Sequence, residues 1–194
     1  METQKNDKYD QILSAAEKML AETGFQGLSM QKLANEAGVA AGTIYRYFSD
    51  KDDLLEQLRH RVVQGIADAV QKNVSDDMPL KERFHTMLNN VWTLANTNTA
   101  QLANQVQYDA LPQAACKRVW EWENERERFG EVEKLFEQGK SEKLFKPLSN
   151  KILVALSFEV IVSLARKQAL NIYPLSEIEL NAAIEACWDA ITIH

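Results

Sequence analysis

The chain has 194 residues, of which 45% are hydrophobic and 26% charged, and its formal net charge at pH 7 is −6. That length is enough for one large hydrophobic core or two small ones. The acidic balance differs from the basic one typical of nucleic-acid binders. Any binding to DNA must therefore depend on a few correctly placed donors, because the overall charge opposes it.

Cysteine usage and hydropathy predict a reduced, cytoplasmic protein without metals or cofactors. Cys116 and Cys187 are far apart and lack the spacing of metal ligands. The N-terminal sequence METQKNDKYD is polar and has no signal-peptide pattern. The longest apolar stretch, residues 152–165, contains Glu159 and two serines and is too short to span a bilayer, so no membrane partner is expected.

Residues 28–55 contain two short helical patterns in the order expected of a helix-turn-helix. Ser29 can accept a hydrogen bond from a backbone N–H and so begin the first helix, which Gly38 can end by adopting a positive φ. Ser49 and Asp52 have the spacing of a capping box for the helix that follows. The expected buried positions of the two short helices are Met30, Leu33, Ala34, Ala37, Ile44 and Phe48.

The second short helix displays side chains suited to a DNA groove. Arg46 offers a planar fork that fits guanine O6 and N7 or holds a phosphate. Tyrosine, serine and threonine hydroxyls reach phosphate oxygens, and a helix N-terminus, where Lys51 stands, is itself an anion site. The pattern predicts DNA recognition by the exposed residues of this helix: Gly42, Thr43, Tyr45, Arg46 and Tyr47.

Residues 9–58 resemble the DNA-binding part of the TetR family of bacterial transcription regulators. The resemblance rests on Ile12, Ala15, Ala16, Met19 and Leu20 of a first helix, then on residues 22–25, 33–39, 42–48 and 51–55 in order. It implies an all-α fold. The N-terminal three-helix helix-turn-helix head would occupy residues 1–50, and a helical effector-binding and dimerisation domain would occupy residues 51–194.

The family's DNA contacts carry over residue by residue. Ser29 and Lys51 match phosphate contacts at two flanking helix starts, while residues 42, 43 and 45–47 match the groove-facing surface. Ala40 departs from the usual serine or threonine cap, which should cost about 1 kcal/mol of helix stability. Ala41 stands where a basic residue or proline is frequent. Two alternatives stay open: one is that Tyr45 packs on the first helix, and the other is that Ser29 serves only as a cap.

Helical patterns punctuated by prolines continue to the end of the chain. Pro79, Pro112, Pro147 and Pro174 each fall where one helix should stop and another begin. No convincing alternating strand pattern lies between them. The expected helices cover residues 50–73, 80–98, 99–110, 113–138, 149–170 and 176–192, with a loop at 139–148.

The last two expected helices are apolar around most of their circumference, so both of their sides should be buried. The family resemblance implies that they pair with their symmetry mates as a four-helix bundle, and a homodimer suits a palindromic operator. The alternative is that these two helices belong only to the internal core of a single chain. The residues expected at the dimer interface are Leu156, Val160, Leu164, Ile184 and Trp188.

Aromatic side chains in the middle of the chain predict a site for a small apolar or aromatic effector. Plain hydrophobic core is the alternative for the same stripe. The residues expected to line the pocket are Phe84, His85, Leu88, Trp92, Tyr108 and Trp122.

These patterns together predict a dimeric, DNA-binding transcription regulator, a repressor that an effector releases from its operator. One alternative is a regulator of the same fold controlled by a protein partner, with no small-molecule pocket. The other is a small all-α enzyme. Catalysis has little support, because His60, His85 and His194 are scattered and no phosphate loop or metal spacing occurs.

Overall fold

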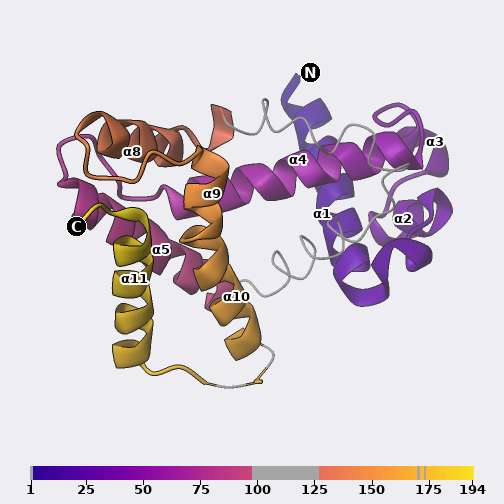
Figure 1. Ribbon diagram of the computed structural model, residues 1–194. Coiled ribbons are helices and arrows are strands. Elements are labelled where there is room, and N and C mark those ends of the chain that lie inside the picture. Colours follow the sequence, from indigo (N-terminus) through magenta and orange to yellow (C-terminus); the bar gives the residue numbers. More distant parts are fainter. Residues whose placement is uncertain (1, 98–126, 170, 173) are drawn as a thin grey trace. The chain divides into compact units, whose positions relative to one another are not determined.

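The computed structural model describes residues 2–97, 127–169, 171–172 and 174–194 (Figure 1). Within these ranges the regular secondary structure is helical, with a single isolated bridge between Phe145 and Thr192, and the expected all-α class is confirmed. The helices are α1 (Glu2–Gly27), α2 (Met30–Glu36), α3 (Ala41–Ile44), α4 (Lys51–Val70), α5 (Leu80–Thr97), α8 (Gly130–Ser141), α9 (Asn150–Ala155), α10 (Phe158–Ala169) and α11 (Glu177–Ile191).

The described residues form two compact units. The first, here called the head, comprises residues 2–64. The second, the C-terminal unit, comprises residues 65–97 and the described residues from 127 to 194. Helix α4 begins in the head and ends in the C-terminal unit. None of the helices in the described ranges is both long and apolar enough to cross a membrane.

Two glycines with positive φ set the turns of the head. Gly24, at φ 64°, kinks α1 near its end. Gly38, at φ 62°, follows α2, and its N–H donates to the Asn35 carbonyl at 3.2 Å. The N–H of Val39 donates to the Ala34 carbonyl at 2.9 Å. These two bonds form a Schellman motif, which confirms the expected glycine stop.

The start of α4 is capped by a different pair from the predicted one. The N–H of Asp53 donates to Asp50 Oδ1 at 2.8 Å, and the N–H of Ser49 donates to Asp53 Oδ2 at 2.8 Å. The prediction of Ser49 with Asp52 is therefore wrong by one residue. Asp50 directly precedes the helix, and a carboxylate accepts a backbone N–H more strongly than a hydroxyl does.

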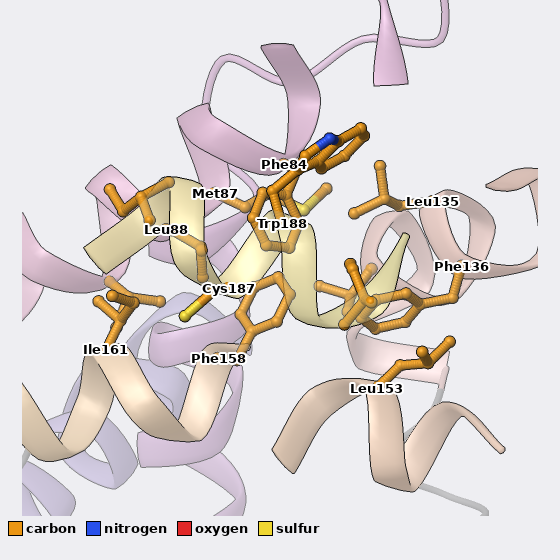
Figure 2. Packing of buried hydrophobic residues seen from close by; sticks show 14 of the residues in the cluster. Phe84, Met87, Leu88, Leu135, Phe136, Leu153, Phe158, Ile161, Cys187 and Trp188 are labelled. Atoms are coloured by element: carbon orange, nitrogen blue, oxygen red, sulfur yellow. The ribbon is translucent and has the colours of Figure 1, made fainter. Parts of the chain in front are cut away.

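The core of the C-terminal unit contains a closed chain of five buried aromatic rings. Figure 2 labels Phe84, Phe136, Phe158 and Trp188 among them. Each ring contacts two others edge-on, with centroids 5.3 to 6.2 Å apart. Edge-on contacts suit the ring quadrupole and add to the stabilisation from burial. In the order in which the rings contact one another, they are Phe84 of α5, Trp188 of α11, Phe145, Phe136 of α8 and Phe158 of α10, which contacts Phe84 again.

The single helix predicted over residues 149–170 is wrong, because α9 and α10 are separate helices. Buried Ser157 lies between them, and its Oγ donates to the Leu153 carbonyl at 2.6 Å. Its own N–H donates instead to the Val154 carbonyl at 3.1 Å, three residues back. A side chain that takes the carbonyl four residues back competes with the helical backbone bond there.

The limits predicted for the long helix of residues 113–138 are also wrong in its described part. Helix α8 begins after Phe129, whose ψ of 38° is not helical, and it continues to Ser141. Gly139 was expected to open a loop and instead lies inside α8. The ring of Phe145 occupies the space that a Cβ at position 139 would need, so the glycine serves close packing. The helix predicted at 99–110 lies outside the described residues.

Candidate nucleic-acid interface

Helix α3 is fixed by two buried side chains and presents its other side to solvent. Ile44 and Phe48 are completely buried, as expected. Phe48 stacks on the Tyr9 ring of α1 with centroids 5.4 Å apart. Arg46 is exposed, and a Cβ added at exposed Gly42 would meet no atom within 4 Å. The backbone of α3 is therefore open to close approach by a large partner at this point.

The two tyrosines of this segment are placed differently from each other. Tyr45 is 58% exposed, so the alternative that it packs on the first helix is wrong. Tyr47 is the half-buried one, and its ring lies 6.2 Å from Tyr9 of α1. Tyr45 and Arg46 are thus the long side chains of α3 and its C-terminal turn that are most available to a partner, with half-buried Thr43 beside them.

The other two expected phosphate ligands stand at helix starts. Ser29 is exposed, and its Oγ accepts the N–H of Lys32 at 3.3 Å, so it is the N-cap of α2. Lys51 is the first residue of α4, and its Nζ donates to the Phe25 carbonyl at 2.9 Å. An ammonium has three N–H donors, so this bond leaves two for a phosphate. The bond also ties the end of α1 to the start of α4.

Long-range hydrogen bonds hold α1 against α2 and α4. Gln11 Nε2 donates to the Ala37 carbonyl at 2.8 Å, and Arg61 Nη2 donates to Ser14 Oγ at 3.0 Å. Tyr9 OH donates to Gln57 Oε1 at 3.2 Å. Partial burial is the main reason that the pKa of Tyr9 is raised, so its hydroxyl stays neutral and can keep donating. The helices that present α3 are therefore braced independently of DNA.

Four of the six residues expected to line an effector pocket lie in the described ranges. Phe84 and Leu88 are completely buried in the core, where Phe84 belongs to the five-ring chain (Figure 2). Trp92 is half-buried against the same core. Tyr108 and Trp122 lie outside the described residues. Phe84 and Leu88 are therefore surrounded by the hydrophobic core of the protein itself, as the alternative expected. The effector pocket stays a prediction.

His85 contacts the last helix. Its Nε2 lies 3.1 Å from Glu185 Oε1, and Lys81 Nζ lies 2.8 Å from Glu185 Oε2. The hydrogen bond from Lys81 is the main cause that lowers the pKa of Glu185, and the charge of His85 contributes. These side chains join α5 to α11 at the surface of the C-terminal unit.

The five residues expected at a dimer interface divide into two groups. Leu156 and Val160 are exposed, and Leu164 is half-buried. Ile184 and Trp188 are buried in the core of the chain itself, which corrects the expectation that they face a partner copy. The ring of Trp188 packs edge-on against Phe84 of α5 and Phe145, and Ile184 belongs to the same core cluster. The large apolar side chain that α11 exposes is Ile178.

Arg83 is a buried cation that the sequence reasoning did not single out. Its side chain is 1% exposed, and Nη1 donates to Gln138 Oε1 at 2.8 Å. Nη2 lies 3.5 Å from Asp76 Oδ1 and 3.8 Å from Glu131 Oε2. The sequence feature that could have identified Arg83 is a charged residue at helical spacing within the apolar stripe of α5. The contacts link α5 to α8, which indicates a structural role.

The chemistry of the head is that of a binding surface. An arginine fork, an exposed tyrosine and two helix starts suit phosphates and base edges. Among the described residues no group of three histidine, cysteine or acidic side chains could hold a metal ion. Taken with the all-α fold, these features define the class of helix-turn-helix DNA-binding proteins.

Comparison with known proteins gives the family. Residues 12–58 match the family described as bacterial regulatory proteins, tetR family, and residues 79–192 match the tetracyclin repressor-like C-terminal domain. The chain is 36% identical over 196 residues to an HTH-type transcriptional regulator of Haemophilus influenzae, covering 98% of this chain and 99% of the relative. The chain therefore belongs to the TetR family and is a DNA-binding transcription regulator.

Solved structures agree with this assignment. A TetR family protein from Vibrio parahaemolyticus is 58% identical, with a TM-score of 0.87 over 96% of this chain and all of that one. A TetR-family regulator from Haemophilus influenzae is 34% identical, with a TM-score of 0.79 over 97% of this chain and 98% of that one. Relatives of this kind are transcription regulators and not enzymes, so the enzyme alternative is not supported.

Proposed function

We propose that this regulator is a homodimeric repressor that binds a palindromic operator and leaves it when a small apolar or aromatic effector binds. The observation that carries the proposal is the exposure of Tyr45 and Arg46 on a segment anchored by buried Ile44 and Phe48. Ser29 and Lys51, at the starts of α2 and α4, would hold phosphates on either side. Binding to chromosomal operators would take place in the cytoplasm.

Exposed apolar side chains on the last helices support the dimer. Ile152, Leu156 and Val160 are exposed on α9, α10 and the turn between them, and Ile178 of α11 is 82% exposed. Exposed large apolar side chains that gather in a patch are typical of an interaction site, and pairing about a two-fold axis would bury these residues. Such a dimer presents two copies of α3 to the two half-sites of a palindrome.

The effector proposal rests on the aromatic composition of the chain between α5 and α8. Trp92 and His85 would contribute from α5, with Tyr108 and Trp122 from the residues between the two helices. A Bacillus subtilis protein named fatty acid metabolism regulator protein is 33% identical over 91 residues, which cover 47% of this chain and of that protein. An acyl chain is accordingly a reasonable first probe among apolar ligands.

The operator is tested by selecting genomic fragments with the purified protein. We expect a short palindrome to be enriched, and Arg46→Ala to abolish the enrichment. Arg46→Lys separates two roles, because a lysine keeps a phosphate contact but loses the fork that reads guanine. Lys143→Ala, at an exposed position of the C-terminal unit, is the matched control and should leave the enrichment unchanged. Equal enrichment by wild type and Arg46→Ala would contradict the proposal.

The effector is tested by titrating the operator complex with a panel of fatty acids and aromatic carboxylic acids. We expect one member to release the operator from the wild-type protein and to act more weakly on Trp92→Ala. If a ligand binds without changing operator affinity, the effector part of the proposal fails. Release by a purified protein partner would then favour the alternative regulator without a small-molecule pocket.

A further inference from the structure

The C-terminal end of α4 is held by two side-chain amides from different elements. Gln71 follows α4 directly, and its Nε2 donates to the Arg128 carbonyl at 2.8 Å while its Oε1 accepts the N–H of Glu131 at 2.7 Å. Asn90 of α5 donates through Nδ2 to the carbonyls of Val70 at 2.9 Å and Lys72 at 2.8 Å. The end of α4 is thus bonded to α5 and to the start of α8.

These bonds supply what the helix ends lack. The N-cap residue of α8 is Phe129, which has no side chain able to accept a backbone N–H, and no side-chain cap bond forms there. Gln71 provides that acceptor from another part of the chain. At the end of α4 the last carbonyls have no partner within the helix, and Asn90 donates to two carbonyls at that end. Both side-chain amides therefore form hydrogen bonds of defined direction with backbone groups.

These bonds lie between the helix that leaves the head and the helices that border the expected effector residues. Helix α4 begins in the head, directly after the α3 segment that carries Tyr45 and Arg46. Helices α5 and α8 border residues 98–126 on either side in the sequence, where the aromatic residues expected to meet an effector stand. The two amides connect the end of α4 to these two helices, Gln71 to α8 and Asn90 to α5.

We propose that Gln71 and Asn90 form an anchor that fixes the end of α4 against α5 and α8 and so sets the half-site spacing that the dimer accepts. The proposal rests on the proposed dimeric binding to a palindrome. Apolar contacts of α4 are not directional, and they resist sliding and rotation less than paired amide bonds do. Without the anchor, α4 would take a range of positions, and operators of different spacing would bind more equally.

The test compares operators whose half-sites stand at the selected spacing with operators in which one or two base pairs are inserted between the half-sites. The variants are Gln71→Leu and Asn90→Ala in the full-length protein. Asn89→Ala is the matched control, because the neighbouring Asn89 amide donates to the His85 carbonyl of its own helix at 2.9 Å. Wild type and Asn89→Ala should discriminate strongly between the spacings. The two anchor variants should lose that discrimination by about tenfold, a typical size for coupling between sites.

A purely structural role for the amides predicts a different result. Lost stability alone would weaken binding to every operator by the same factor, as Ile191→Val in the core of the C-terminal unit should do. A uniform loss, or an unchanged spacing profile, therefore overturns the anchor. Should Gln71→Leu not fold, Gln71→Glu keeps the acceptor for the Glu131 N–H and removes the donor to the carbonyls of Arg128 and Ala67. If the wild type selects no palindrome at all, the proposed function fails first, and that outcome is visible before any variant is made.

Discussion

The head exposes one of its aromatic side chains beside a buried one, whereas the C-terminal unit buries a closed chain of five. In the C-terminal unit Phe84, Phe136 and Trp188 are buried in a closed chain of edge-on rings. In the head the burial of Ile44 and Phe48 leaves Tyr45 exposed on the same short segment. In the head, the side chains expected to bind DNA therefore differ from those that stabilise the fold. In the C-terminal unit the same residues that suggested a ligand site also hold the fold together.

The polar contacts of the two units differ in how deeply their groups are buried. The head depends on caps and on bonds between helices, such as those of Ser29, Asp50 and Gln11. The C-terminal unit contains Arg83, which is 1% exposed and bonded to Gln138, and its helix α8 is capped by the amide of Gln71. Short helices bury little area each, so their ends contribute a large share of their stability. Substitutions can test this difference one unit at a time.

The largest expected effect is loss of stability when the aromatic chain is broken. Phe84→Ala removes a completely buried ring with three aromatic partners beside it, and it should lower the free energy of unfolding by about 3–5 kcal/mol. Tyr45→Ala, at an exposed position, should change it by less than about 0.5 kcal/mol. Denaturant unfolding followed by circular dichroism measures both. Equal losses would mean that the two units do not differ as described.

The next effect concerns DNA binding by the two tyrosines. Tyr45→Phe removes an exposed hydroxyl that can reach a phosphate, and it should weaken operator binding by about 1.5 kcal/mol without changing stability. Tyr47→Phe should have a smaller effect, because that ring is half-buried against Tyr9. Fluorescence anisotropy with the selected palindrome gives both affinities. A larger loss in Tyr47→Phe would indicate that α3 meets DNA with its other side.

A smaller effect tests how strongly the head depends on its caps. Ala40 is the N-cap residue of α3 and makes no side-chain cap bond. Ala40→Ser should raise the free energy of unfolding by up to about 1 kcal/mol, and Asp50→Ala should lower it by about 1 kcal/mol through loss of the α4 cap. Thermal unfolding compares the two variants with wild type. No gain from Ala40→Ser would indicate that serine cannot reach the α3 backbone.

The smallest expected effect is a pH dependence in the C-terminal unit. The hydrogen bond from Lys81 lowers the pKa of Glu185 in the folded protein relative to the unfolded chain. A carboxylate of lowered pKa stabilises the fold above its unfolded pKa of about 4.3, and the contribution disappears as the pH falls through the folded value. Glu185→Gln should therefore flatten the decline of melting temperature below pH 5. An identical decline in wild type and variant would contradict this.

Much of the head followed from the order of its residues alone. Ser29 as a cap, Gly38 as a stop and Ile44 with Phe48 as a buried pair depend on neighbours within about four positions, and all three expectations are confirmed. The choice of Asp50 over Ser49 as the cap of α4 required the actual hydrogen-bond geometry. Local interactions decide such features, so a short sequence window contains the information.

The assignment of apolar and polar side chains in the C-terminal unit was decided only by tertiary structure. An apolar stripe predicts that Phe84, Ile184 and Trp188 are covered, but it does not say whether a ligand, a partner copy or the chain itself covers them. Phe145 and the far helices supply that cover here. The capping of α8 by Gln71 likewise joins positions 60 residues apart. No local pattern predicts such contacts, because they depend on how distant segments pack.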